Sequence, residues 1–106
     1  MRFKYTRISG VKTVPTAAAE PVFDLSGVDV EKVVGFMVVS SPSNAVGSKI
    51  GVGESTITTA GPFLAPGAGY NEDKIGENVP DPTTLNCIGS VAGLKLFTWL
   101  YLKVGV

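Results

Sequence analysis

The sequence contains no histidine and a single cysteine, and each of these absences removes a class of chemistry. Without histidine, neither a Ser-His-Asp nor a Cys-His catalytic arrangement can be built, and the commonest general base is missing. Cys87 can form neither a disulfide within the chain nor a cysteine-based zinc site, and we interpret it as a small buried hydrophobe. We therefore expect a protein that is not an enzyme, with no catalytic residues, no cofactor and no metal.

Charged residues are scarce as well. They make up 17% of the chain, with nine Lys plus Arg balanced by nine Asp plus Glu, whereas the surface of a free small domain is usually about 25–35% charged. The cations near the N-terminus, Arg2, Lys4 and Arg7, are expected to be solvated, so we predict no nucleic-acid partner. Low charge favours a protein that works in an assembly, where part of its surface is covered.

Long hydrophobic runs are also missing. The most apolar stretch is LKLFTWLYLKV, Leu94 to Val104, which is about half of the roughly 20 residues that a membrane-spanning helix needs. The N-terminal segment MRFKYTRISG lacks the apolar core of a signal peptide. We expect no membrane partner and a chain that stays in the cytoplasm in which it is made.

Residues 94–104 have the composition and the alternation of a long β-strand. Its two faces are both apolar, and this pattern allows two interpretations. Either the strand is central and the chain itself covers both faces, or the aliphatic face fills the core and the aromatic face meets another subunit. The aliphatic face would carry Leu94, Leu96, Thr98, Leu100, Leu102 and Val104, and the aromatic face Lys95, Phe97, Trp99, Tyr101 and Lys103.

Thirteen glycines and seven prolines divide the rest of the chain into short strand-like runs. VVGFMVVSS is apolar on both faces and predicts a second central strand, and only single helical turns are expected, in TAAAE and DVEKV. The pattern predicts one all-β domain over residues 1–106, a small antiparallel β-sandwich or jelly-roll-like barrel. The strands expected are Arg2–Ile8, Val11–Val14, Val22–Leu25, Val33–Ser40, Lys49–Val52, Ser55–Thr59, Leu85–Ile88 and Leu94–Val104.

The segment from Ala60 to Thr84 is rich in proline and glycine and predicts one long irregular loop, of a length that is usually functional or ordered by a partner. Its acidic and amide groups indicate a solvated loop, although their oxygens could also hold a hard cation or, beside Tyr70, a sugar. These groups are Asn71, Glu72, Asp73, Glu77, Asn78 and Asp81. The glycines of GVGES are interpreted as turn or close-approach positions rather than a phosphate loop.

The two segments IGVGESTITTAGPFLAPGAGY and TLNCIGSVAGLKLFTWLYLKV resemble a pattern of small bacteriophage virion structural proteins built as β-sandwiches. The resemblance covers residues 44–104, while residues 1–43 look like extra strands without a counterpart. It implies that Leu64 plugs one end of the sandwich, that Gly67 makes the turn before the chain crosses to the other sheet, and that GSVAG is a hairpin into the last strand. The chain departs from the pattern by inserting YNEDKIGENVPDPTT where such proteins have a short link.

The resemblance implies a non-enzymatic component of a virus particle, assembled in the host cytoplasm: a capsid decoration or cement protein, or a module of the neck, tail or fibre. Its expected partners are the major capsid protein or other virion proteins and further copies of itself. The alternatives are a carbohydrate-binding receptor module and a free β domain. The candidate interface residues, which ordinary core packing would also explain, are Phe63, Leu64, Tyr70, Phe97, Trp99 and Tyr101.

Overall fold

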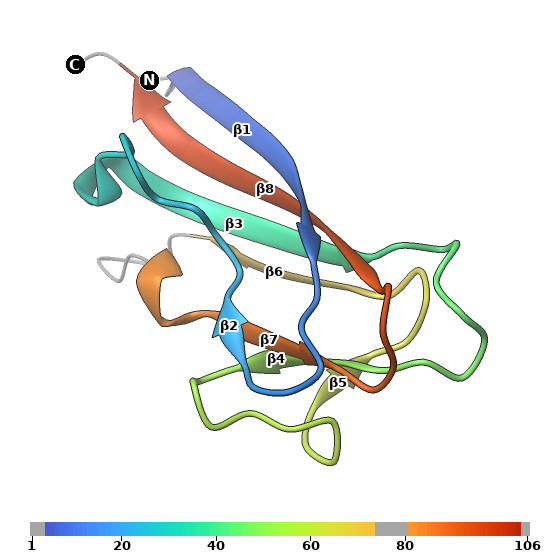
Figure 1. The fold of residues 1–106 in the computed structure, drawn as a ribbon. Coiled ribbons are helices and arrows are strands. Elements are labelled where there is room, and N and C mark those ends of the chain that lie inside the picture. Colours follow the sequence, from blue (N-terminus) through green and yellow to red (C-terminus); the bar gives the residue numbers. More distant parts are fainter. Residues whose placement is uncertain (1–3, 74–80, 105–106) are drawn as a thin grey trace.

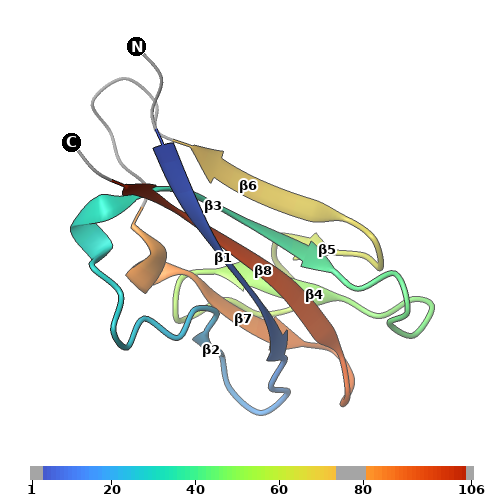
Figure 2. The same ribbon diagram turned by 90° about the horizontal axis from the view of Figure 1, so that it is seen from above.

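The computed structural model describes residues 4–73 and 81–104, and their strands form two antiparallel sheets of four (Figure 1). One sheet, here called sheet A, has the order β1-β8-β3-β6, and the other, sheet B, has the order β2-β7-β4-β5. Seen from above, sheet A lies across sheet B as the second layer of a sandwich (Figure 2). The strands are β1 (Lys4–Thr13), β2 (Glu20–Pro21), β3 (Val33–Ser40), β4 (Ile50–Gly53), β5 (Phe63–Leu64), β6 (Gly69–Asp73), β7 (Asn86–Gly89) and β8 (Lys95–Val104).

The strand order is that of a jelly roll. β1 pairs with β8, β2 with β7, β3 with β6 and β4 with β5, so the chain forms one long antiparallel ribbon with β4 and β5 at its tip. The additional pairs β3·β8 and β4·β7 close this ribbon into the two sheets. The prediction of an all-β sandwich with jelly-roll character is therefore confirmed, and this is an architecture found in viral capsid and lectin domains, among others.

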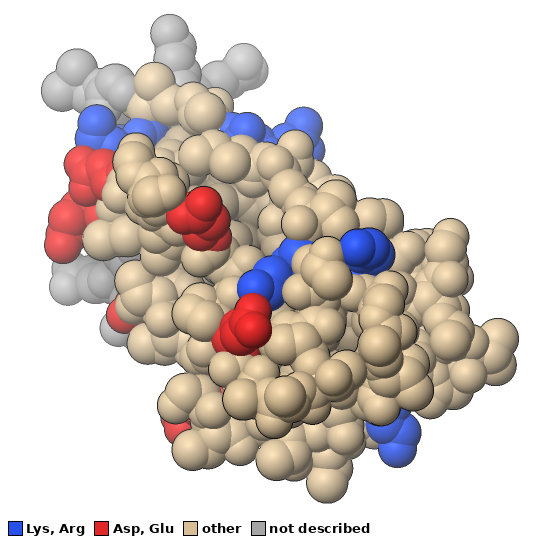
Figure 3. All heavy atoms as spheres, viewed as in Figure 1, with Lys and Arg blue, Asp and Glu red and all other residues tan. Residues whose placement is uncertain are grey.

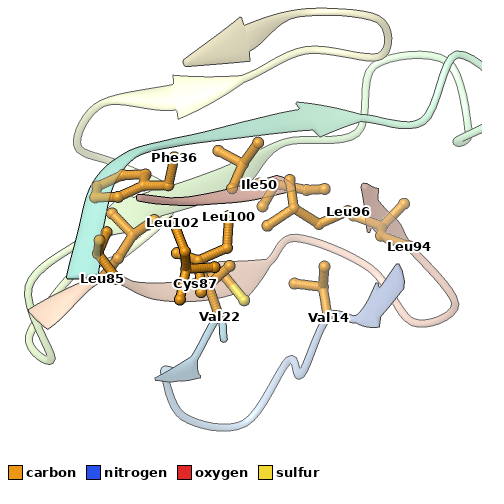
Figure 4. Packing of buried hydrophobic residues seen from close by; sticks show 12 residues of the cluster. Val14, Val22, Phe36, Ile50, Leu85, Cys87, Leu94, Leu96, Leu100 and Leu102 are labelled. Carbon is orange, nitrogen blue, oxygen red and sulfur yellow. The ribbon is translucent and has the colours of Figure 1, made fainter. Parts of the chain in front are cut away.

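The core lies between the two sheets, and the aliphatic face of β8 contributes a row of leucines to it (Figure 4). Leu94, Leu96, Leu100 and Leu102 are all buried, as the alternation of this strand predicts. Burial of each such side chain stabilises the fold by about 1.5–3 kcal/mol. Val14, Val22, Val33, Phe36, Val38, Ile50, Leu85 and Cys87 complete the cluster.

Several predicted strand boundaries are wrong because long-range pairing decides them. The expected strands Arg2–Ile8 and Val11–Val14 are one strand, because β1 passes through Ser9 and Gly10 without a turn while it pairs along β8. The strand expected at Val22–Leu25 is displaced to β2 (Glu20–Pro21), because pairing with β7 stops there. Ser55–Thr59 is a turn region without strand pairing.

The expected long loop from Ala60 to Thr84 is not structureless. It contains β5, which pairs with β4, and β6, which pairs with β3. Gly67 lies between these two strands and has a positive φ of 84° where the chain passes from sheet B to sheet A, as expected for this turn. GSVAG is not a hairpin, because β7 belongs to sheet B and β8 to sheet A, so this segment is also a crossover. Leu64 is half-buried and packs against the core. The helical turn expected in DVEKV is present as the short 3-10 segment η1 (Val30–Lys32).

Two features hold the connections between the sheets in place. At Gly51 in β4 an added Cβ would lie 2.7 Å from the carbonyl oxygen of Thr58, so the close approach of the 54–61 segment requires glycine. The buried amide of Asn44 donates to the Lys95 carbonyl oxygen and accepts from the Lys95 N–H, each at 2.9 Å. This amide ties the β3–β4 connection to the first residue of β8.

Candidate assembly surface

The aromatic side chains of β8 lie on the outer face of sheet A, directed away from the core. Residues directly opposite each other in an antiparallel pair share a face, so the register of β8 with β1 and β3 defines this surface. Phe97 lies between Val11 and Val39, and Trp99 lies between Ser9 and Met37. The outer face, as we use the term below, comprises Tyr5, Arg7, Ser9, Val11 and Thr13 of β1, Gly35, Met37 and Val39 of β3, Gly69, Asn71 and Asp73 of β6, and Lys95, Phe97, Trp99, Tyr101 and Lys103 of β8.

The centre of the outer face is apolar and preorganised. The rings of Phe97 and Trp99 meet edge to face, with centroids 6.4 Å apart, and both are half-buried among their neighbours on the same face. At the β1 side, Val11 is 62% exposed and Tyr5 is 60% exposed. Packed rings with exposed apolar neighbours suit a surface that another molecule covers, because little side-chain entropy remains to be lost on contact.

No segment among the described residues lies over this face (Figures 1 and 2). An antiparallel sheet that faces water normally has polar residues on that side, and here two adjacent strands contribute apolar ones. Figure 3 has the viewpoint of Figure 1 and looks at the molecule from another side, where separate acidic and basic groups are scattered over a mostly uncharged surface. Of the two interpretations of the last strand, the one in which the chain covers both faces has no support in the described residues.

The six candidate interface residues fall into two groups. Phe97, Trp99 and Tyr101 belong to the outer face of sheet A. The other three candidates line a separate hollow of about 300 Å³ beside the edge strands β5 and β6. They are Phe63, which is 46% exposed beneath the Lys49 ammonium at 4.8 Å, together with Leu64 and Tyr70.

The acidic cluster that includes Tyr70 is divided by the alternation of β6. The Tyr70 hydroxyl donates to Glu72 Oε1 at 2.6 Å, and its ring lies 6.4 Å from that of Phe36. Asn71, between Tyr70 and Glu72 in the sequence, belongs to the other face of the strand, where it pairs with Met37. Glu77 and Asn78 lie outside the described residues, and Asp81 caps the 3-10 segment η2 (Pro82–Thr84) by accepting from the Thr83 N–H. Within the described ranges no group of three or more potential metal ligands is found.

The hydrogen-bonded hydroxyl of Tyr70 makes the stability of the fold depend on pH in the alkaline range. Burial, followed by the hydrogen bond to Glu72 and the negative charge of that carboxylate, raises the pKa of Tyr70 to about 12. An unfolded tyrosine titrates near pH 10, so between pH 10 and 12 the unfolded chain loses this proton before the folded chain does. The contribution of Tyr70 to the free energy of unfolding is therefore complete below pH 10 and is lost as the pH rises toward 12.

Denaturant unfolding followed between pH 9 and 12, with Tyr70→Phe as the matched control, measures this effect. We expect the wild-type protein to lose stability with pH more steeply than the variant above about pH 10. Equal slopes for the two proteins would contradict this prediction, because they would show that Tyr70 has the same pKa in the folded and unfolded states.

Sequence reasoning found the aromatic half of the outer face but missed the part contributed by β1 and β3. The sequence predicts Met37 and Val39 only as members of a central strand, and it predicts Tyr5 and Val11 on two separate strands, whereas both belong to β1. The signal was present in the double apolar alternation of VVGFMVVSS. What was missing was the register that places these residues beside Trp99.

The outer face also contains a hollow of about 540 Å³ where β3 has no side chain at Gly35. Tyr5, Tyr101 and Asn71 are among its walls, so two aromatic rings and one amide converge on it. A shallow site with these groups can stack an apolar or sugar ring and hydrogen-bond its substituents.

The sequence matches no protein-family model and no curated protein. In the part of the chain that the structure describes, no helix has the length and hydrophobicity needed to cross a membrane.

Proposed function

We propose that this protein is a non-enzymatic structural component of a bacteriophage particle, a capsid decoration or cement protein that binds the major capsid protein and other copies of itself. The observation that carries the proposal is the apolar outer face of sheet A, centred on Phe97, Trp99 and Met37. The jelly-roll strand order and the low charge of the chain are consistent with this role.

The mechanism is burial of the outer face against a neighbouring subunit. A specific protein interface removes about 1,600 Å² from water, and its energy is concentrated in central aromatic residues of the kind found here. Repetition over the many equivalent positions of a shell multiplies a modest affinity for each contact through multivalency. A small rigid β-sandwich with an apolar sheet face meets these requirements without any reactive group.

A tagged copy of the protein, produced in its own host during particle formation, tests the proposal. We expect the protein to be recovered in gradient-purified particles, and we expect Trp99→Glu and Met37→Glu to remain soluble but to be lost from them. Incorporation should fall about 100-fold or more, because a charge buried without a partner at the centre of an interface is strongly unfavourable.

Val46→Glu is the matched control, because Val46 is fully exposed in the β3–β4 connection, outside the outer face. This variant should be incorporated like the wild-type protein. Absence of the wild-type protein from the particles, or normal incorporation of both outer-face variants, would contradict the proposal.

A second candidate function, a carbohydrate-binding receptor module, is favoured by the hollow over Gly35 with its two tyrosines and the Asn71 amide. In that case the purified protein should bind members of a panel of soluble oligosaccharides, and Tyr101→Ala should abolish binding. Loss of sugar binding without loss of particle incorporation would assign the hollow and the apolar centre of the face to different partners.

A further inference from the structure

Strand β1 is a long open edge of sheet A. Its ten residues pair with β8 on one side only, and among the described residues no strand pairs with its other side. The Val14 N–H donates to the Leu94 carbonyl oxygen in continuation of this ladder. Since hydrogen-bonded and non-hydrogen-bonded positions alternate in an antiparallel pair, the even-numbered residues of β1 point their backbone groups toward β8.

The odd-numbered residues 5, 7, 9, 11 and 13 therefore direct their N–H and C=O groups outward. Edge strands of this length are normally protected by proline, a bulge, a covering segment or charged side chains. Strand β1 has only charges of this kind, at Lys4, Arg7 and Lys12, and Lys12 is ion-paired with Glu20 at 2.9 Å. The register of β1 with β8 is unbroken from Lys4 to Thr13, and no proline interrupts it. The same strand carries three exposed large hydrophobic side chains: Tyr5 at 60%, Ile8 at 45% and Val11 at 62% exposed.

We propose that β1 pairs in antiparallel fashion with β1 of a second copy of this chain, around a two-fold axis that places Ile8 opposite Ile8. The outward N–H and C=O groups of residues 5, 7, 9 and 11 then pair in about eight hydrogen bonds, two for each hydrogen-bonded pair. The two copies of sheet A become one continuous eight-stranded sheet. Two-fold dimers are the commonest form of self-association.

The cross-strand neighbours select this register. On the outer face Tyr5 lies opposite Val11, an aromatic and β-branched pair that stabilises antiparallel sheets, and Arg7 lies opposite Ser9. On the inner face Ile8 lies opposite Ile8 of the second copy, and Thr6 lies opposite Gly10. Lys4 lies opposite Lys12 at each end of the pair, where the charge of Lys12 is offset by its ion pair with Glu20 at 2.9 Å. All three exposed hydrophobic residues of β1 thus gain an apolar partner.

The neighbouring registers are worse. A shift of the pairing by two residues in one direction places Arg7 opposite Arg7, and like charges directly opposite each other are destabilising. The same shift in the other direction places Ile8 opposite Gly10 and Arg7 opposite Val11. Registers with an odd offset place outward groups against groups that point toward β8 and cannot form the ladder.

A hollow on the inner side of β1 gives the second Ile8 side chain a place to pack. This hollow of about 320 Å³ lies between β1 and the residues that follow β2, and Ile8, Val22, Phe23, Val28 and Leu100 contribute its apolar lining. It exists because β2 has only two residues and leaves the inner side of β1 partly uncovered. The partner's Ile8 would lie at the rim of this hollow.

This pairing goes beyond the proposed function and does not depend on it. It would join two outer faces into one larger apolar surface, which any flat partner could cover. A protein that dimerises but is never found in particles would support the β1 pairing and contradict the proposed function. A protein that stays monomeric but is incorporated into particles would do the reverse.

Cysteine cross-linking tests the register. In the proposed pair residue 8 occupies a non-hydrogen-bonded position, with Cα atoms about 4.5 Å apart, within the range of about 4.4–6.8 Å that a disulfide bridges. Ile8→Cys should form a covalent dimer when diamide is added to dilute protein, and Ser9→Cys, on the other face of the strand, should not. The native Cys87 does not compete, because it is fully buried and burial raises the pKa of its thiol to about 11.

Sedimentation equilibrium tests the pairing without a cross-link. Ser9→Pro removes an outward N–H that the monomer does not use, a position where an edge strand tolerates proline, and Ser9→Thr keeps it. We expect the wild-type protein and Ser9→Thr to dimerise and the dimer of Ser9→Pro to be about tenfold weaker or more. A wild-type monomer at all concentrations, cross-linking at Ser9→Cys instead of Ile8→Cys, or equal dimerisation of Ser9→Pro would overturn the proposal.

Discussion

Replacing Phe36 with alanine is expected to lower the free energy of unfolding by about 3–5 kcal/mol. Phe36 is 2% exposed at the centre of the core, and its ring meets that of Phe23 edge to face at 5.5 Å between centroids. Removing the ring eliminates its transfer free energy and leaves a cavity that the surrounding β-sandwich can fill only in part. Domains of this size are stable by about 5–15 kcal/mol in total, so this loss is a large fraction of the whole.

Urea denaturation measures the change, with Phe63→Ala as a control of the same chemistry. Phe63 is 46% exposed and contacts the Lys49 ammonium across one face of its ring, so its removal should cost less than about 1 kcal/mol. Similar losses for the two variants would contradict the placement of Phe36 in the core.

Replacing Asn44 with alanine is expected to cost about 2–4 kcal/mol, an unusually large effect for a residue of a connecting segment. Its amide donates to the Ser40 hydroxyl and to the Lys95 carbonyl oxygen, and it accepts from the Lys95 N–H. The carbonyl keeps a second donor, the Ser41 N–H at 3.1 Å, whereas the Lys95 N–H loses the partner shown for it. A partly buried N–H without a partner costs about 1–3 kcal/mol, to which the loss of the other two bonds adds.

Thermal unfolding of this variant should show a midpoint lower by at least about 8 °C. Ser43→Ala is the matched control, because the Ser43 side chain is exposed in the same connection and only its backbone N–H is hydrogen-bonded. Its midpoint should stay within about 2 °C of wild type. Equal midpoints for the two variants would show that the Asn44 amide does not hold the start of β8.

The six candidate interface residues illustrate how far sequence patterns reach toward a site. The alternation of residues 94–104 correctly separated Phe97, Trp99 and Tyr101 from the leucines that fill the core. It could not reveal which strands flank β8, because pairing partners are set by contacts between residues far apart in the chain. Residue type alone groups Phe63 and Tyr70 with the β8 aromatics, whereas the topology places them in a hollow apart from the outer face.

The sequence by itself determined the all-β class, the two long central strands and their division into faces, because a strand with a period of two displays its environment in its own residues. It also indicated the turn at Gly67, since a positive φ selects glycine. The two-residue strands β2 and β5, the continuity of β1 through Ser9 and Gly10, and the crossover at GSVAG were decided by the tertiary structure alone. These elements exist only where a distant strand offers hydrogen-bonding partners, and no local pattern of side chains records that condition.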